Sequence, residues 1–442
     1  MPRALARSNA PRNLKRCYAV AVEVLDSRTL LSAAVFSWEM APRIAVERGQ
    51  GDAFALPNTP DYVSPAGGYR VLLDASKTPG IRPASTFTWT VSESGNVIST
   101  VQGKKSSVSL PEGSYSVRLS VGGVRGAKAP VVAAEDIVVK DVLVVSIGDS
   151  YASGEGNPVT NGVYFIKSAQ WAYSPDAAMK LQNAKGHRST LSGPAQFALA
   201  LERSDPHQAV TFVSVANSGA RIDKGLLGSM KSNIDSDYTL PGQIDQVRQL
   251  IGSRSIDVLT VSIGGNDIGF SSRLKELASN SLLGNVTQGE IRNSVDADLA
   301  ELPQKYAALD RAIDGLNPDK VLITEYPDIT GNQKGQYAPI RLVGVSAISK
   351  ENVEFADKAI LQPLNQSIET AAAANGWTAV DYADEFRTHG YSSTKSWVRS
   401  FGESMKYESS SIGAFHPNQK GQMVIANHLL DAYDQTVVAS LS

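Results

Sequence analysis

Short apolar runs that recur through the second half of the chain constrain its fold more than any other feature. They occur at residues 142–147, 258–263 and 321–324, and between them Ile244, Val247 and Ile251 repeat with the spacing of one helix face. Buried parallel strands show as apolar runs, and strands that alternate with helices form α/β folds. The pattern predicts an α/β fold with a mainly parallel sheet. A ligand of such a sheet binds beyond the carboxyl ends of the strands.

The preceding residues, from about 53 to 140, follow a period of two. Phe87, Trp89 and Val91 alternate with threonines, and apolar residues alternate with Ser or Arg over 115–121. This alternation, punctuated by turn residues, is typical of half-buried antiparallel strands and predicts a small β-sandwich. We therefore expect an N-terminal targeting or disordered tail (1–40), a β-sandwich (41–140) and a catalytic α/β domain (141–442).

Charge and cysteine content exclude several classes of function. Lys and Arg number 42 against 44 Asp and Glu, so the net charge of −2 gives no reason to expect nucleic acid as a partner. No apolar run is long enough to predict a transmembrane segment. The single cysteine, Cys17, excludes an intrachain disulfide and a cysteine-bound zinc site. No His/Asp/Glu spacing suggests a metal, so we expect neither metal nor cofactor.

The N-terminal residues leave two interpretations open. Five basic residues precede Glu23, but the apolar stretch after them is broken by that acid, which argues against a standard signal peptide. Residues 22–33 resemble a short motif of some large bacterial surface proteins, Leu-Glu-Pro-Arg-x-Leu-Leu, with Asp26-Ser27-Arg28 in place of Glu-Pro-Arg. The resemblance implies an extracellular or cell-surface bacterial protein. The alternative is a disordered basic tail.

The first candidate for chemistry is Ser150, which follows the apolar run 142–147 in a glycine-rich segment, 148–157. Its position predicts a serine at the mouth of the sheet, on a sharp turn that glycines permit. An ordinary strand-to-helix turn with a capping serine is equally compatible with this segment alone. A phosphate-binding loop is a weaker alternative, because no Gly-Lys-Ser/Thr follows.

Three further blocks stand after predicted strands or before a helix. They contain Gly219 (217–220), Asn266 (264–267) and His416 (415–421). Pro417 is typical of a first helical residue, so His416 is expected at a helix entrance. Taken alone, Asn266 could be a turn former, since Gly-Gly-Asn-Asp is a strong turn signal.

The four blocks in this order resemble the SGNH (GDSL-like) hydrolases, a family of serine esterases and lipases, over about residues 141–435. The resemblance implies a three-layer α/β fold, with Ser150 as nucleophile and His416 as general base. It also implies an oxyanion hole made by the backbone N–H groups of Ser150 and Gly219 and the side-chain amide of Asn266. These roles suit the residue types, because a serine needs a base and a developing oxyanion needs fixed donors.

Two positions depart from the family pattern. Members commonly carry an aspartate three residues before the histidine, where this chain has Gly413. We predict a Ser150–His416 dyad in which the Gly413 backbone carbonyl orients the imidazole, with Asp381 or Asp384 as the alternative. Relatives of one bacterial branch also have cysteines in place of Gly186 and Asn217. Both are absent here, as expected if they form one disulfide.

The predicted reaction is hydrolysis of a carboxylic ester through an acyl-serine intermediate. The expected substrate is a small-molecule, lipid or acetylated-carbohydrate ester, and we expect a monomer. Residues 110–121, with Trp89 upstream, resemble Ig-like domains of the polycystic-kidney-disease type, which implies a spacer or adhesive module. Alternatives are a carbohydrate O-deacetylase, a lipase or phospholipase, and a non-catalytic surface adhesin built on the hydrolase scaffold.

Overall fold

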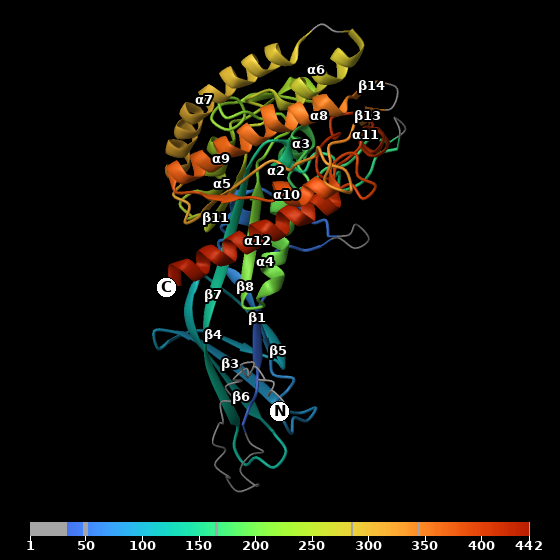
Figure 1. The fold of residues 1–442 in the computed structure, drawn as a ribbon. Helices are drawn as coiled ribbons and strands as arrows, with labels where there is room; N and C mark the ends of the chain where they lie inside the picture. Colours follow the sequence, from blue (N-terminus) through green and yellow to red (C-terminus); the bar gives the residue numbers. More distant parts are fainter. Residues whose placement is uncertain (1–32, 47–51, 164–166, 284–285, 343–344, 442) are drawn as a thin grey trace, which may run out of the picture. The chain divides into compact units, whose positions relative to one another are not determined.

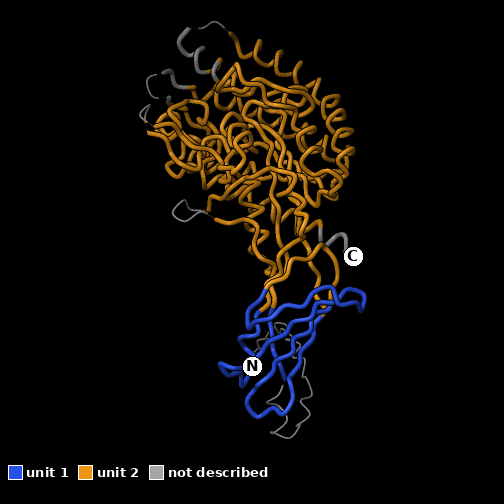
Figure 2. The backbone as a smooth tube through the Cα atoms, turned by 180° about the vertical axis from the view of Figure 1, so that it is seen from behind, with its two compact units in different colours: residues 1–37, 74–106, 116–135 blue, residues 38–73, 107–115, 136–442 orange. Residues whose placement is uncertain are grey.

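The computed structural model describes residues 33–46, 52–163, 167–283, 286–342 and 345–441 (Figure 1). The N-terminal motif at 22–33, apart from its last residue, lies outside the described residues. The chain divides into two compact units (Figure 2). Unit 1 consists of Met1–Ser37, Asp74–Ser106 and Ser116–Glu135, and unit 2 of Trp38–Leu73, Ser107–Tyr115 and Asp136–Ser442.

The elements alternate strongly between strand and helix only in the second half of the chain. The strands are β1 (Ser37–Met40), β2 (Tyr69–Asp74), β3 (Thr86–Glu93), β4 (Asn96–Gln102), β5 (Lys105–Leu110), β6 (Gly113–Gly122), β7 (Val131–Gly148), β8 (Gln208–Ser214), β9 (Met230–Ser232), β10 (Asp235–Leu240), β11 (Val258–Ser262), β12 (Val321–Thr324), β13 (Ile340–Leu342), β14 (Val345–Ile348) and β15 (Thr378–Val380). The helices are α1 (Pro60–Val63), α2 (Ser150–Ser153), α3 (Ala177–Lys185), α4 (Gly193–Ser204), α5 (Gln243–Ile251), α6 (Phe270–Leu283), α7 (Gln288–Asp314), α8 (Lys350–Ala356), the π-helical turn η1 (Asp357–Leu361), α9 (Gln362–Asn375), α10 (Ala383–Phe386), the 3₁₀ turn η2 (Arg387–His389), α11 (Phe401–Glu408) and α12 (Gln419–Leu441).

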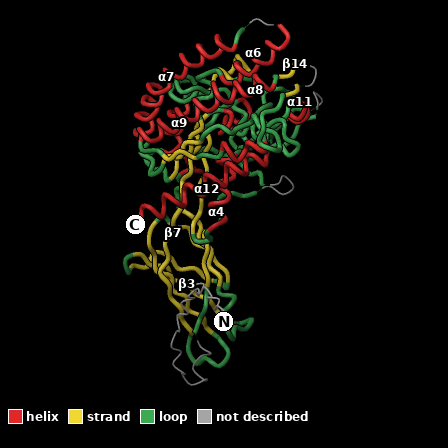
Figure 3. The backbone as a smooth tube through the Cα atoms, viewed as in Figure 1, coloured by secondary structure: helices red, strands yellow, loops and turns green. Residues whose placement is uncertain are grey.

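Unit 1 is built on antiparallel strands and, in its described residues, contains no helix (Figure 3). Strand β3 pairs with β4 on one side and with β6 on the other, so that Trp89 faces Val101 and Leu119 across the ladders. Trp89 is fully buried, and its indole N–H donates to the Gly103 carbonyl at 2.8 Å. The predicted alternation of β3 is thus present, with its odd-numbered apolar residues inside.

Unit 2 holds a run of parallel strands in the order β15-β12-β11-β7, with β8 beside β7. The register places Ser262 of β11 opposite Gly148 of β7, and Ser214 of β8 opposite Ser146. The last eight residues of β7 are all buried, as the apolar run predicted. Because these strands are parallel and in step, the loops that follow them leave from one edge of the sheet.

Helices cover these strands. Helix α4 contacts β8 and also packs along α12. Both α12 and α9 contact strands β12 and β15. Helix α7 packs against α9. The interior is one apolar cluster made by the strands and the inner faces of the helices. No helix in the described ranges has the length and apolar character needed to cross a membrane.

The sheet differs from the prediction in one respect. The eight-stranded sheet that contains β7 also includes the antiparallel β6, β3 and β4, so it is mixed rather than mainly parallel as a whole. The reason is the length of β7, which has 18 residues. Its residues up to Glu135 belong to unit 1 and those from Asp136 belong to unit 2. A separate two-sheet sandwich stays a prediction.

Residues 38–73 are grouped with the second half of the chain, while the expected limits at residues 40 and 140 stay a prediction. Phe54, Leu56 and Val63 belong to the same buried cluster as the apolar half of β7. The Asn58 side chain donates to the carbonyl of Ser214 at 2.6 Å, at the end of β8. Residues 38–73 therefore build the larger unit. A short segment without a repeating period carries no local signal of which core it will join.

Candidate active site

Ser150 lies where β7 gives way to a single helical turn. Gly148 ends the strand with φ +143°, and a Cβ there would lie 2.3 Å from the Ser262 carbonyl, so a side chain has no room. Asp149 caps the turn by accepting the Tyr151 N–H at 3.0 Å. Ser150 is the first residue of α2, with 7% of its surface exposed. The strand end and cap therefore present its hydroxyl at the sheet edge.

His416 is in direct contact with this serine. Its Nε2 lies 2.7 Å from the Ser150 Oγ. The turn that holds the imidazole has Phe415 at φ +70°, and Arg399 pairs with it through backbone hydrogen bonds to Phe415 and His416. Burial lowers the pKa of His416 below its ordinary value, which keeps the ring neutral and able to accept a proton near pH 7.

The backbone carbonyls of the turn before His416 lie close to its ring. The His416 Nδ1 lies 3.2 Å from the carbonyl oxygen of Ala414, whereas the Gly413 carbonyl accepts the backbone N–H of His416 at 3.3 Å. The ring thus has the carbonyl two residues back within hydrogen-bond distance, and the Gly413 carbonyl as orienter stays a prediction. Asp381 and Asp384 are both exposed, and Asp381 accepts the N–H of Ala383.

Gly219 and Asn266 stand in the loops after β8 and β11, beside the loop of Ser150. The Asn217 N–H donates to the Gly148 carbonyl at 3.1 Å, and the Asn266 amide donates to the Ala220 carbonyl at 3.0 Å. Gly219 has φ +84°, and a Cβ there would meet the Asn233 side chain. Over the described residues, the backbone N–H groups of Ser150 and Gly219 have no protein acceptor. These two donors are free for a ligand.

Tyr326 joins the serine loop to the asparagine loop. Its hydroxyl donates to the Asp149 carboxyl at 2.5 Å and accepts the Gly265 N–H at 2.9 Å. Burial raises the pKa of Asp149 to about 7. This bridge fixes the spacing of the two loops. No local pattern around Tyr326 indicates it, because the contact spans 177 residues.

A second buried acid follows Ser150 in the same glycine-rich segment. Glu155 is fully buried, and both its carboxylate oxygens lie within 2.9 Å of the His187 Nδ1. Trp171 stacks on the His187 ring at 4.0 Å between centroids. Glu408 from α11 is also buried, and burial together with the charge of Glu155 raises its pKa to about 8. Sequence reasoning missed both acids, although Glu155 stands within the glycine-rich segment.

Gly186 and Asn217, where the family resemblance implies cysteines, are adjacent in space. A Cβ on Gly186 would lie 2.4 Å from the Asn217 side-chain oxygen. That oxygen accepts from the buried guanidinium of Arg188 at 2.9 Å, which also donates to the carbonyls of Val215 and Ala216. A hydrogen-bonded arginine thus ties the two segments where the relatives are expected to have a disulfide.

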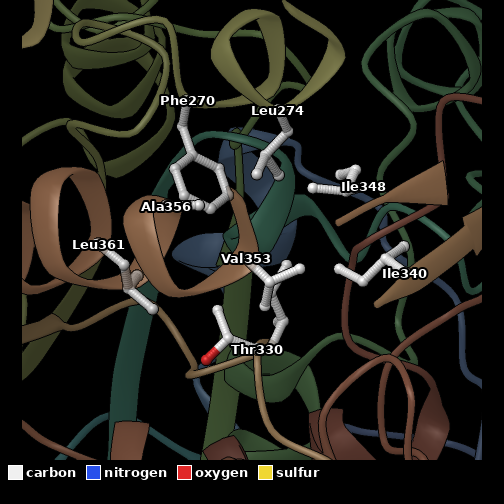
Figure 4. Close-up of a pocket in the computed structure, with 9 residues that line it drawn as sticks. Phe270, Leu274, Thr330, Ile340, Ile348, Val353, Ala356 and Leu361 are labelled. Carbon is white, nitrogen blue, oxygen red and sulfur yellow. The ribbon is translucent and has the colours of Figure 1, made fainter. Parts of the chain in front are cut away.

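An apolar pocket is lined by residues of α6, β13, β14 and α8 (Figure 4). Phe270 and Leu274 of α6 face Val353 and Ile340 across it. Thr330 also lines it, but its hydroxyl donates to the Asp328 carboxylate at 2.5 Å. Phe270 begins α6 four residues after Asn266. Within the described ranges, no group of three or more His, Cys, Asp or Glu side chains is placed to hold a metal ion.

Comparison with known proteins gives the following matches. The chain is similar in structure to an extracellular lipase from Streptomyces rimosus (21% identity, 66% of this chain and 99% of that one, TM-score 0.43). It is similar to phospholipase A1 from Streptomyces albidoflavus NA297 (19% identity, 66% and 98%, TM-score 0.42) and to an acetyl xylan esterase from Geobacillus stearothermophilus (13% identity, 67% and 96%, TM-score 0.35). No curated protein matches the chain. The model of the GDSL-like lipase/acylhydrolase family matches residues 146–424, more than half of the 442 residues, and the chain therefore belongs to that family.

Proposed function

We propose that this chain is a serine esterase that hydrolyses carboxylic esters through an acyl-serine intermediate. The observation that carries the proposal is the 2.7 Å contact between the Ser150 Oγ and the His416 Nε2. A serine hydroxyl becomes a useful nucleophile only when a base removes its proton, and a buried neutral histidine at hydrogen-bond distance is such a base.

The proposed reaction has two halves. Ser150 attacks the ester carbonyl while His416 takes its proton, and the tetrahedral intermediate then expels the alcohol, which receives that proton. Water, deprotonated by His416, attacks the acyl-serine and releases the acid and the free serine. The free N–H groups of Ser150 and Gly219 stabilise the oxyanion, and the Asn266 amide joins them once it turns from the Ala220 carbonyl.

Histidine orientation in this proposal comes from the backbone. The Ala414 carbonyl accepts the Nδ1 proton and so selects the tautomer with a free Nε2 lone pair facing Ser150. A neutral carbonyl stabilises the imidazolium less than a carboxylate does. The dyad therefore works without a carboxylate in contact with the ring.

The experiment combines labelling with a substrate panel. A fluorophosphonate probe should label the wild-type chain and should not label Ser150→Ala. Hydrolysis of p-nitrophenyl esters from acetyl to palmitoyl, alongside acetylated xylan, then separates an esterase, a lipase and a carbohydrate O-deacetylase. A folded wild-type protein that neither labels nor hydrolyses any of these esters would favour the non-catalytic adhesin.

Three wider features are also proposed. We propose a three-layer catalytic domain preceded by an Ig-like β-sandwich, export to the bacterial surface and a monomeric state. The first two are based on the strand pattern around Trp89 and the N-terminal motif. Fractionation of the native host with an antibody against the chain tests export, and light scattering tests the monomer.

A further inference from the structure

The space of the missing triad acid is filled by another residue. A Cβ on Gly413 would lie 2.4 Å from the Glu408 Oε2 and 2.8 Å from the Gly156 Cα. A side chain at 413 would collide with the Gly156 backbone, and the Glu408 carboxyl from α11 also occupies that place. Glu408 carries its proton at neutral pH, since burial and the nearby Glu155 raise its pKa to about 8. It therefore adds no negative charge beside His416 there.

Glu155 is the acid that carries the charge. Although burial raises its pKa, the bonded His187 and the nearby His416 outweigh that effect, and the pKa of Glu155 lies below its ordinary value. Two oxygens within 2.9 Å of one imidazole nitrogen fix its carboxylate, and the stacked Trp171 fixes that imidazole. The carboxylate is thus ionised, fully buried and held in one orientation.

The segment of Glu155 is locked against the turn of His416. A Cβ on Gly156 would lie 3.2 Å from the Gly413 carbonyl and 3.6 Å from the His416 Cβ. Arg399 joins the two segments, because its side chain donates to the Gly156 carbonyl and its backbone N–H to the His416 carbonyl. Asn157 adds a hydrogen bond to the Pro417 carbonyl at 2.7 Å. The distance between the carboxylate and the imidazole is therefore a fixed property of the fold.

The other titratable groups around this pair do not supply the same charge. Tyr151 packs on His416 with ring centroids 5.0 Å apart, and burial raises its pKa further above neutrality. Glu408 is protonated at neutral pH. The Arg399 guanidinium is positive and is directed at the Gly156 carbonyl and the Asn157 side chain. Among these groups, Glu155 alone favours an imidazolium at His416.

We propose that Glu155, held by His187, is a positioning residue that supplies at a distance the negative charge a triad aspartate would place against His416. The inference rests on the proposed function, in which His416 becomes cationic in each half of the reaction. Glu155 does not touch the substrate and moves no proton. Its effect is electrostatic, and it persists because both groups are buried, where charges interact more strongly than in water.

The test is the pKa of His416 with and without that charge. Glu155→Gln keeps the shape and a hydrogen-bond partner for His187 but removes the charge. The chain has five histidines, so NMR can follow the His416 signal, identified by its loss in His416→Gln. We expect its pKa to be lower in Glu155→Gln. The acid limb of the kcat/KM profile should move to lower pH with it, while the plateau falls on the order of 10-fold, far less than the roughly 10⁴-fold of a contacting aspartate.

Glu408→Gln is the matched control, because it removes a buried carboxyl in the same place that is neutral across the acid limb. It should leave the His416 pKa and the acid limb unchanged. If Glu155→Gln does not fold, the double variant Glu155→Gln/His187→Gln replaces the pair by two neutral amides, and the same shift is expected.

An unchanged His416 pKa in a folded Glu155→Gln or double variant overturns the proposal, as does an equal shift in Glu408→Gln. A fall in rate at all pH values with no move of the acid limb would show a structural role only. The NMR titration needs no substrate. If the wild-type chain hydrolysed no ester, the proposed esterase function would be refuted, but the titration would still show whether Glu155 raises the pKa of His416.

Discussion

The two units of the molecule bury different kinds of side chain. Over the described residues of unit 1, the buried side chains are apolar except for Thr78, and Trp89 lies at their centre. Unit 2 buries Asp149, Ser150, Glu155 and His416 in addition to a large apolar cluster. Burying a polar or charged group is unfavourable unless partners satisfy it, so such groups persist where they have a use. The difference indicates that the core of unit 1 serves stability alone, whereas unit 2 also buries side chains suited to chemistry.

The largest expected effect is on the nucleophile. Ser150→Ala should lower kcat on the order of 10⁶-fold, because among the described residues no other hydroxyl is paired with His416. Ser146→Ala is the matched control, since this buried serine of β7 has no hydrogen-bond partner among the described residues. Steady-state kinetics on a small p-nitrophenyl ester gives both values. Wild-type turnover in Ser150→Ala would end the assignment.

In the core of unit 1 we expect a large effect on stability and little effect on activity. Trp89→Ala should destabilise unit 1 by about 3–5 kcal/mol, because a fully buried indole and its hydrogen bond are lost. The kcat/KM of the folded variant should stay within about a factor of two, as the unit that contains Trp89 holds none of the proposed site residues. Thermal unfolding and kinetics on the same sample check the two halves of this prediction. A drop of about tenfold or more in a folded variant would show that unit 1 helps to build the site.

The oxyanion donor comes next. Asn266→Ala should lower kcat by roughly 10²–10³ with little change in KM, because the amide acts on charge that develops during the reaction. Asn233→Ala, on the neighbouring side of Gly219, serves as control and should change kcat little. If Asn266→Ala instead raised KM at unchanged kcat, the residue would be a binding or structural group.

Buried acids in unit 2 should show in the pH dependence of stability. The pKa of Glu408 is about 8 in the folded protein against 4.5 as its ordinary value. The folded state therefore holds this proton more tightly than the unfolded state, and its stabilising effect, complete below about pH 4.5, is lost as pH rises to 8. Glu408→Gln should remove this loss, with a relative gain of up to about 4 kcal/mol at pH 8 compared with pH 4.5. Urea unfolding at the two pH values measures it, and parallel curves for both proteins would contradict the assignment.

The smallest effect is expected from the exposed aspartates. Asp381→Asn and Asp384→Asn should each leave kcat within a few-fold, because substitutions of exposed residues have small effects. The same esterase assay applies to both. A loss near the roughly 10⁴-fold seen when a triad aspartate is neutralised would identify a displaced carboxylate and remove the need for a backbone carbonyl.

Local chemistry in the sequence was enough to find the strand ends and the residues beyond them. The apolar run before Ser150 and the glycine at 148 determine a buried strand and a sharp turn, since both depend on residues that are neighbours in the chain. The same holds for the alternation of β3. The order of four short blocks then indicated which of these turns meet in space.

Only the tertiary structure decided which groups support those residues. The His416 Nδ1 lies near the Ala414 carbonyl on a turn in which Phe415 has φ +70°, and no local pattern marks this non-glycine residue. Tyr326 reaches Asp149 across 177 positions, and His187 reaches Glu155 across 32. Residues 38–73 likewise belong to unit 2 because Phe54 packs in its apolar cluster and Asn58 bonds to β8, both through long-range contacts. These contacts follow from how the whole chain packs, and hydrogen bonds between distant positions carry no periodic signal along the sequence.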